Sequence, residues 1–305
     1  MGTAGVRPQA SAGVPEATDD PLVLLARAEA RLAQLLPPLP IGETGVLVDA
    51  ARSALLSPGK RARPVMAMLA CAHVGGTSLS ALNYGCAVEM VHAASLVLDD
   101  LPCMDNAALR RGAPTVHRAH GEDAAVLSAI ALLNQAHRTV LSDAALGAQL
   151  RLTLLDAITE AVGFDGLAHG QIRDLRDPAD DRTEYGLRRL NHLKTGALFV
   201  AALRGGGLIG GGVPAQLDAL STFGEAVGFA FQLCDDLHDV QATTQALGKD
   251  VRQDRDKVTF VDLWGAGRVQ TAIRQSLARA QEALGADCAL SAYAWELFRN
   301  AGFTR

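Results

Sequence analysis

Long stretches in which apolar residues recur every three or four positions make up most of this chain. That spacing puts apolar side chains on one face of an α-helix, whereas a half-buried strand needs strict alternation, of which no convincing run occurs. Such faces are stable only when they pack together. The sequence therefore predicts an all-α fold, a helical bundle with helices over residues 22–36, 45–56, 62–74, 79–101, 122–142, 147–163, 186–204, 216–240 and 267–284.

The domain organisation follows from length and local composition. A chain of 305 residues that is 49% hydrophobic is long enough to bury one large core. Residues 1–20 are rich in Ala, Gly, Pro and Thr, which predicts a disordered leader. We therefore expect one large helical domain over residues 21–305.

A glycine-rich segment at residues 204–212 interrupts this pattern. Each glycine inside a helix costs about 1 kcal/mol relative to alanine, so we interpret the segment as a loosened helix end. A phosphate-cradling loop is the less favoured alternative, because no lysine with P-loop spacing follows.

Charge and cysteine content exclude several classes of protein. A net charge of -5 argues against nucleic-acid binding, which needs a basic face. The five cysteines are odd in number and contain no C-x-x-C pair, so neither disulfides nor zinc are expected, and a cytoplasmic location is predicted. No signal peptide is recognised, and the nearest candidate for a membrane span, residues 196–212, is broken by Arg204 and the six glycines that follow it. We expect no membrane span.

The first acidic cluster comprises Asp99, Asp100 and Asp105. It closes the most apolar predicted helix, in which residues 90–98 read as interior. A solvated helix end is the simplest interpretation of two adjacent aspartates. Here the carboxylates lie at the mouth of a core, where unpaired charge is costly and a bound cation would relieve that cost.

The second acidic cluster comprises Gln232, Asp235, Asp236 and Asp239. Their i, i+3, i+4, i+7 spacing puts all four on one helix face. Stacked carboxylates repel one another, so their presence in an apolar helix indicates compensation by a metal ion. Ligation by oxygen alone favours Mg²⁺, which bridges carboxylates to substrate phosphates.

Basic residues flank both clusters in the order that a diphosphate site would need. Each one alone is better explained as a surface charge, and the set is what carries the argument. The set contains Lys60, Arg61, Arg63, Arg110, Arg111, Lys249 and Lys257.

Two further positions have open alternatives. His92 lies seven residues before Asp99 on the same helix face, where a core histidine bonded to a carbonyl is an equally good interpretation. Lys194 and Thr195 would face a phosphate or a cationic intermediate, or lie on an exposed helix surface.

These motifs together resemble the trans-isoprenyl diphosphate synthase (polyprenyl synthetase) family over about residues 58–259. The run from Ser95 to Asp105, followed by residues 109–117, resembles the first aspartate-rich motif of that family, and residues 231–239 resemble the second. Residues 59–64, 166–174 and 192–195 resemble three further landmarks in the expected order. Within the family the chain is most similar to bacterial and plant-type geranylgeranyl diphosphate synthases.

The resemblance implies a fold, cofactors and roles for individual residues. The expected fold is a single bundle around a central apolar cavity, and the expected assembly is a homodimer. Up to three Mg²⁺ ions would be held by Asp99, Asp105 and Asp235, with support from Asp100 and Asp239. Among the other catalytic positions, Asp236 accompanies the second cluster, and Thr195 and Gln232 line the reacting centre. The allylic diphosphate would contact Arg110, Lys194, Lys249 and Lys257, and isopentenyl diphosphate would contact Lys60, Arg63, His92 and Arg111.

The implied reaction joins isopentenyl diphosphate to an allylic diphosphate such as the dimethylallyl, geranyl or farnesyl compound. Metal ions and basic groups stabilise the departing pyrophosphate, and the isopentenyl double bond attacks the resulting cation in a dry cavity. Loss of a proton completes each condensation.

In this family, product length depends on the residues beneath the first aspartate. The fifth residue before Asp99 is Ala94, and Ser95 follows it, so no aromatic stopper is present there. A twenty-carbon product, geranylgeranyl diphosphate, is therefore expected. The alternatives are a farnesyl diphosphate synthase, a terpene cyclase of the same fold, or a non-catalytic partner subunit. The basic run at residues 59–64 with Arg110 and Arg111 argues against a cyclase, and retention of both acidic clusters argues against a partner subunit.

Overall fold

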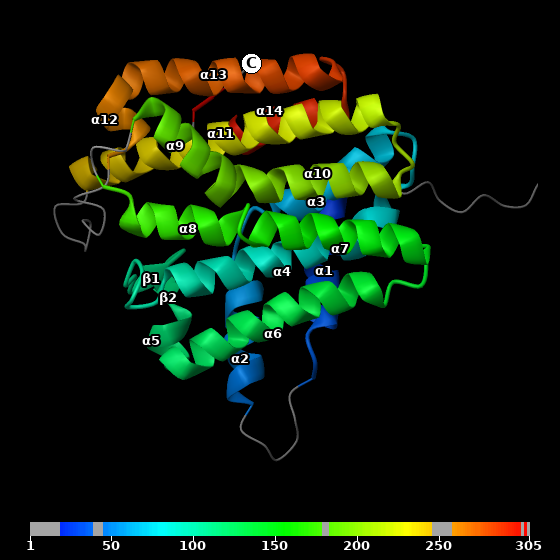
Figure 1. The fold of residues 1–305 in the computed structure, drawn as a ribbon, viewed down its shortest axis with the longest axis horizontal. Coiled ribbons are helices and arrows are strands. Elements are labelled where there is room, and N and C mark those ends of the chain that lie inside the picture. Colours follow the sequence, from blue (N-terminus) through cyan, green and yellow to red (C-terminus); the bar gives the residue numbers. More distant parts are fainter. Residues whose placement is uncertain (1–18, 39–44, 179–182, 246–257, 300–301, 304–305) are drawn as a thin grey trace, which may run out of the picture.

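The computed structural model describes residues 19–38, 45–178, 183–245, 258–299 and 302–303, with the backbone alone over 241–245. The predicted leader therefore lies outside the described residues except for its last two positions. The described part is almost entirely helical, as the apolar periodicity predicted. Most of its longer helices stack in layers with their axes roughly aligned in the view of Figure 1, whereas α2 runs across them.

The described residues in the first half of the chain form seven α-helices and a small hairpin. The helices are α1 (Pro21–Leu35), α2 (Val46–Leu55), α3 (Ala62–His73), α4 (Leu82–Asp99), α5 (Val116–His120), α6 (Glu122–Leu141) and α7 (Ala148–Val162). A 3-10 turn, η1 (Ser78–Ala81), leads directly into α4. Strands β1 (Leu109–Arg110) and β2 (Ala113–Pro114) pair antiparallel after α4.

The second half begins with α8 (Leu167–Arg176) and α9 (Glu184–Asn191). A π-helical turn, η3 (His192–Gly196), then joins α9 to α10 (Ala197–Ile209). The remaining helices are α11 (Pro214–Gln245), α12 (Phe260–Trp264), α13 (Ala266–Leu284) and α14 (Ala289–Arg299). The helix predicted over 186–204 is therefore a run of three segments, and α5, α8, α12 and α14 were not predicted. All four are short, and periodicity is weak in helices of so few turns.

Two helices at the centre of the stack hold the bundle together. α10 packs against α3, α4, α7 and α11, and α4 packs against α3 and α6 (Figure 1). One apolar cluster lies among α3, α11, α13 and α14, and a second lies among α2, α4, α6 and α7. Because α4 and α10 are covered on several sides, they are apolar around most of their circumference.

The stretch that comes nearest to a membrane span in length and composition is Ser78 to Asp99, and not residues 196–212 as expected from the sequence. It is 22 residues long with a mean hydropathy of 1.3, so by length and composition it is apolar enough to cross a membrane. In the fold, however, 67% of its most apolar 18-residue stretch is buried. A core helix of a globular bundle has the same composition, and the packing identifies this segment as one.

The glycine-rich segment is also corrected. Gly205 to Gly207 are buried inside α10, and the helix continues to Ile209 before it ends. A Cβ atom at Gly205 would overlap the ring of Tyr84, and one at Gly206 would overlap the carbonyl group of Ala67. These glycines therefore allow α10 to approach α3 and α4 closely, which a loosened helix end would not require.

We predict that Gly206→Ala destabilises the protein, although alanine is the better helix former. The added methyl group meets the backbone of α3, and overpacking of this kind costs roughly 1–3 kcal/mol. The matched control is Gly267→Ala in α13, where nothing lies within 4 Å of the added Cβ and the helix should gain up to about 1 kcal/mol. Thermal or urea unfolding of the two variants measures the difference. Equal stability of both variants would contradict the close-packing explanation.

Candidate functional site

The first acidic cluster is held at the C-terminal end of α4. Asp99 is the last helical residue, and a tight turn folds back over it, with the Asp105 amide donating to the Asp99 carbonyl at 2.9 Å. Asp100 is 2% exposed and accepts from Nε of Arg110 at 2.9 and 2.8 Å, and Nη2 of Arg110 lies 2.7 Å from its Oδ1. This paired geometry fixes the β1–β2 hairpin against the end of α4.

Arg110 and Asp100, both predicted site residues, therefore form an ion pair with each other. Burial opposes the charge on Arg110, but the hydrogen bond with Asp100 and the negative charges of Asp100, Asp99 and Asp105 together outweigh that effect and raise the pKa of the guanidinium. The pair orders the loop that carries Asp105.

The second acidic cluster lies on one face of α11, as its spacing predicted. Asp235 and Asp239 are exposed, whereas Asp236 is buried and hydrogen-bonded. Asp236 accepts from the Gln232 side-chain amide at 2.9 Å and from the Phe260 backbone amide at 3.1 Å. Asp236 therefore ties the N-terminus of α12 to α11, and Asp235 and Asp239 point outward from the same face.

The π-helical turn η3 presents Lys194 and Thr195 to this cluster. The Lys194 ammonium lies 2.7 Å from the carboxylate of Asp174 in α8, and the Thr195 hydroxyl donates to Gln232 Oε1 at 3.2 Å. A π-turn inserts an extra residue into a helix and is frequent at functional sites. Here it connects α8, α9 and α11 around one polar centre.

A pocket of about 140 Å³ joins the two acidic clusters. Asp105 of the first cluster and Asp236 and Asp239 of the second all line it. Its other polar walls are Asp174, Asn191, Lys194, Gln232 and Thr259. Carboxylates that are about 130 residues apart in sequence thus face one cavity.

The predicted isopentenyl diphosphate residues gather beside an aromatic pair. The rings of Phe199 and Phe231 are stacked at 5.0 Å; the Arg63 guanidinium lies 4.4 Å from the first and the Lys60 ammonium 5.4 Å from the second. Arg111 reaches the same corner and donates to the Pro58 carbonyl at 2.9 Å. The aromatic faces stabilise these cations and hold them in position.

Electrostatics in this corner favour an anionic ligand. Burial, partly offset by Glu89 and Asp235, lowers the pKa of Arg63 to about 10, which still leaves it protonated at neutral pH. Burial and then the nearby arginines, Arg63 foremost, lower the pKa of His92 well below its usual value. His92 is therefore neutral, and the surrounding positive charge belongs to the arginines.

In the acidic clusters, by contrast, it is negative charge that lacks compensation. The crowded surroundings of Asp99, Asp235 and Asp236 weaken the hydration of their carboxylates and raise the pKa of each to about 6, although part of Asp235 reaches solvent. Neighbouring aspartates raise these pKa values further, Asp105 acting on Asp99 and Asp239 on Asp235 and Asp236. A divalent cation between the clusters would offset this repulsion, so the donor set fits Mg²⁺.

Among the described residues, no three His, Cys, Asp or Glu side chains form a ready-made metal cage. This agrees with the chemistry of Mg²⁺, which is usually held by one or two carboxylates together with water and substrate phosphates. The acidic walls leave the remaining coordination positions to a ligand.

The remaining predicted residues do not line the pocket or the basic corner, or lie outside the described part of the chain. Arg61, considered as part of the basic set, is buried in an ion pair with Glu89 at 3.1 Å and so has a structural role. Ala94 is fully buried in α4, and the Ser95 hydroxyl donates to the His92 carbonyl at 2.9 Å. Lys249 and Lys257 lie outside the described residues.

Sequence reasoning missed Asp174, Asn191 and the aromatic pair. Asp174 was part of a motif that we recognised at residues 166–174, but the lysine that it contacts is 20 residues away, in η3. Phe199 and Phe231 read as core residues. Only the packing of α10 against α11 shows that they also carry cations.

We predict that Asp99→Asn stabilises the metal-free protein at neutral pH. The pKa of Asp99 is raised from 3.8 to about 6 in the fold, so between these values the folded state binds more protons than the unfolded state. The unfolding free energy of the wild type therefore falls as pH rises through that window, and the variant lacks this loss.

The gain at pH 7 should be at most about 3 kcal/mol, which is a rise in melting temperature of several degrees. Melting curves of both proteins from pH 4 to pH 7 with a chelator test it, and adding Mg²⁺ should narrow the gap. A variant that is less stable than the wild type at pH 7 would show that the carboxylate is not under electrostatic strain.

Comparison with known proteins gives a consistent result. The sequence profile of the polyprenyl synthetase family matches residues 45–282. The geranylgeranyl diphosphate synthase of Pantoea ananas is 40% identical over 267 residues, which cover 87% of this chain and 87% of that protein. The chloroplastic geranylgeranyl pyrophosphate synthase 11 of Arabidopsis thaliana is 38% identical over 273 residues, covering 87% of this chain and 76% of that protein.

Solved structures agree in fold. A FPP/GFPP synthase from Zymomonas mobilis superposes with a TM-score of 0.79 and 32% identity, covering 92% of this chain and 96% of that one. A geranyltransferase from Legionella pneumophila has a TM-score of 0.81 and 28% identity, covering 93% of this chain and 97% of that one. These similarities extend across both acidic clusters and the helices that carry them.

Proposed function

Because the chain belongs to the polyprenyl synthetase family, we propose that it is a prenyltransferase that condenses isopentenyl diphosphate with an allylic diphosphate. The observation that carries this proposal is the single pocket lined by Asp105 on one side and by Asp236 and Asp239 on the other. A diphosphate bound there would meet Asp105 from the turn after α4, Asp236 and Asp239 from α11, and Lys194 from η3.

The allylic diphosphate would bind between the acidic clusters. Asp99, Asp105, Asp235 and Asp239 would hold Mg²⁺, which would neutralise the charge that develops on the departing pyrophosphate. Lys194, kept in position by Asp174 at 2.7 Å, adds a positive charge from the protein. The ion pair of Asp100 with Arg110 keeps the loop of Asp105 in place, and Arg110 contributes its charge at the rim.

Thr195 and Gln232 form a hydrogen-bonded pair that Asp236 orients, and Gln232 is the member of the pair that lines the pocket. Their oxygens would lie beside the carbocation, where oriented dipoles stabilise developing positive charge. No side-chain nucleophile is needed for this reaction.

Isopentenyl diphosphate would bind beside the aromatic pair. Lys60, Arg63 and Arg111 supply the cations, and neutral His92 supplies a ring nitrogen without adding charge. The two diphosphates would then lie close together, because Lys60 and Arg63 of the basic corner are near enough to Asp235 to offset part of the rise in its pKa.

The preferred product is geranylgeranyl diphosphate. Ala94 is a small residue one turn above the end of α4, so a growing tail could pass where a bulky side chain would block it. The relatives named geranylgeranyl diphosphate synthase support this choice. A farnesyl or longer product is the second candidate, because the similar Zymomonas mobilis structure is named an FPP/GFPP synthase.

A cytoplasmic homodimer completes the proposal. The outer face of α6 exposes Val126, Leu127 and Ile130, with Leu127 56% exposed and Ile130 49% exposed. These side chains are neighbours on the outer surface of the helix, as expected for a surface that a second copy covers. The mostly buried apolar helix α4 supports a location away from the membrane interior.

We predict that the purified protein forms geranylgeranyl diphosphate from isopentenyl diphosphate and dimethylallyl, geranyl or farnesyl diphosphate in the presence of Mg²⁺. Chelation of the metal should abolish turnover, and Asp235→Asn should lower kcat by about a hundredfold or more. Chromatography of the dephosphorylated products identifies the chain length. Formation of a hydrocarbon from farnesyl diphosphate alone would instead assign a cyclase, and inactivity with every primer would favour a partner subunit.

A second prediction concerns product length: Ala94→Tyr should shorten the main product from twenty to fifteen carbons. The tyrosine ring would fill the space beneath Asp99 that the growing tail needs. The matched control is Ala278→Tyr, the same change at an exposed position of α13. An active Ala94→Tyr variant with unchanged product length would reject Ala94 as the position that limits the tail.

A further inference from the structure

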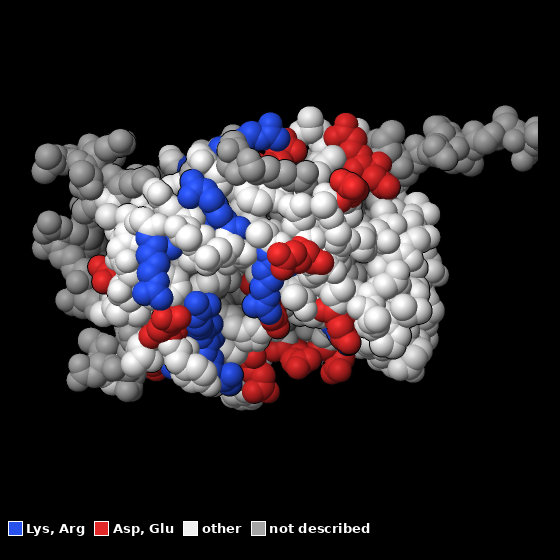
Figure 2. Space-filling view, turned by 90° about the horizontal axis from the view of Figure 1, so that it is seen from above, with Lys and Arg blue, Asp and Glu red and all other residues white. Residues whose placement is uncertain are grey.

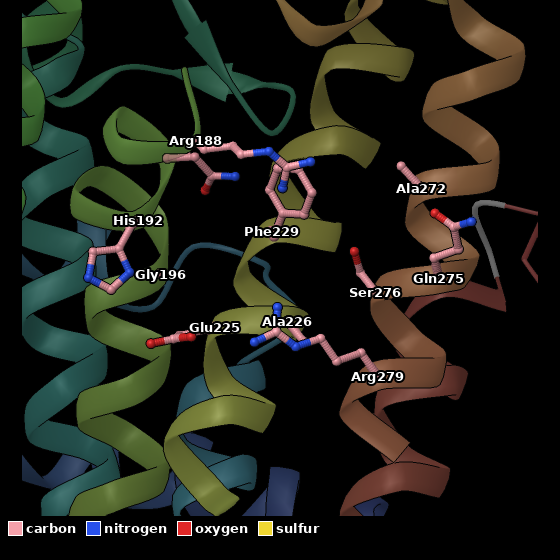
Figure 3. Close-up of a pocket in the computed structure, with 11 residues that line it drawn as sticks. Arg188, His192, Gly196, Glu225, Ala226, Phe229, Ala272, Gln275, Ser276 and Arg279 are labelled. Carbon is pink, nitrogen blue, oxygen red and sulfur yellow. The ribbon is translucent and has the colours of Figure 1, made fainter. Parts of the chain in front are cut away.

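A second pocket lies on the other side of η3 from the site just described. Its volume is about 320 Å³, and α9, η3, α11 and α13 form its walls (Figure 3). This volume is at the lower end of the range found for small-molecule sites. None of the predicted catalytic residues lines it.

A buried polar side chain without a partner marks the wall between the two pockets. Asn191 is 4% exposed, and neither its amide nitrogen nor its amide oxygen has a hydrogen-bond partner among the described residues. Leaving such a group unpaired is costly, and native proteins rarely do so. Asn191 lines this pocket and the site pocket, so a ligand in this pocket could satisfy the amide.

Two arginines approach this pocket from opposite ends. Arg188 extends from α9 across the ring of Phe229, and Arg279 extends from α13 toward Ala226 (Figure 3). Arg188 contacts Glu184 through Nε alone, at 3.1 Å, which leaves its terminal nitrogens for a further acceptor. Within the described part of the chain, Arg279 has neither a hydrogen bond nor an ion pair.

The rest of the lining restricts what can bind. Phe229, Ala226 and Ala272 form an apolar middle between the two guanidinium groups. Glu225 lies on the same side as His192, away from Arg188 (Figure 3). Acidic groups of a ligand therefore belong at the two arginine ends, with a compact carbon or phosphate frame between them.

We propose that this pocket binds a compact polyanion with an acidic group at each end, and that binding changes the position of Lys194 and Thr195. The link is direct, because Asn191 immediately precedes η3 and η3 carries both residues. The regulatory half of this proposal rests on the proposed function, whereas the binding half does not.

The large-scale charge pattern does not by itself attract such a ligand. On the face seen in Figure 2, which includes α13, basic and acidic side chains are interspersed. Recognition would therefore depend on the two arginines and the Asn191 amide within the pocket.

Tryptophan fluorescence can report binding directly. The chain has two tryptophans, and Trp264 lies 5.3 Å from the Arg188 guanidinium, so movement of Arg188 toward a ligand would alter its emission. Trp295 bonds to Gln281 elsewhere, and Trp295→Phe removes its signal. In that background, metal-free protein is titrated with citrate and, separately, with inorganic tripolyphosphate, using chloride at equal ionic strength as the reference.

Three variants locate the binding. Arg279→Gln removes one end of the pocket, Arg274→Gln changes an arginine of the same helix that packs on Phe303 instead, and Lys194→Met alters the site pocket alone. We expect saturable binding of at least one probe, weakened tenfold or more by Arg279→Gln and within twofold of the parent in the other two variants. The probe that binds distinguishes carboxylate from phosphate recognition.

Two results would overturn the binding half: no saturable change with either probe in the millimolar range, or a signal that Lys194→Met abolishes and Arg279→Gln retains. The regulatory half is tested by turnover with isopentenyl diphosphate. In this turnover assay the bound probe should change kcat or KM at least twofold in the Trp295→Phe protein, and should leave both unchanged when Arg279→Gln is added. Probe binding without that difference would reject the coupling, and the absence of any turnover would instead count against the proposed function.

Discussion

Negative charge at the edge of an apolar bundle is the constraint on which the candidate site depends. α4 ends in Asp99 and Asp100, and α11 carries Asp235, Asp236 and Asp239 on one face, although both helices are largely built from core residues. Carboxylates in this setting are poorly solvated and repel one another. Each therefore needs a partner from the protein or from a ligand.

The protein itself neutralises only part of this charge. Arg110 pairs with Asp100, Lys194 pairs with Asp174, and Asp236 accepts two hydrogen bonds. Asp99 and Asp235 keep raised pKa values near 6, because burial outweighs the nearby cations. The groups that are internally satisfied position the site, and those that are not are the ones that a metal and a diphosphate would complete.

Close packing of the central helices keeps the two acidic walls near each other. Gly205 and Gly206 in α10 allow Tyr84 and the backbone of α3 to lie against the helix, and α11 packs on its other side. η3 interrupts the regular helix at Lys194, which lines the pocket, and at Thr195, which bonds to Gln232 on the pocket wall. The same interruption exposes Asn191 to a second cavity, so a local departure from regular helix connects two sites.

Features that depend on residues close together in the sequence could be predicted, and features that depend on contacts between separate helices could not. Helical periodicity predicted the nine long helical stretches to within a few residues at most ends, because it reports burial along one element. It missed α8, which has only 10 residues and carries Asp174. It also gave the wrong reason for Gly205 to Gly207, since intrinsic helix propensity takes no account of a neighbouring helix that needs their space.

The sequence by itself determined the helical bundle, the two acidic clusters and the basic residues around them, because each is a local pattern of spacing and side-chain chemistry. The tertiary structure alone decided which groups meet: Asp105 with Asp239 across one pocket, Arg110 with Asp100, and Lys194 with Asp174. It also decided that Arg61 serves the core and that Asn191 lies unpaired between two cavities. Contacts between residues far apart in the chain arise from how helices pack, and no local pattern encodes them.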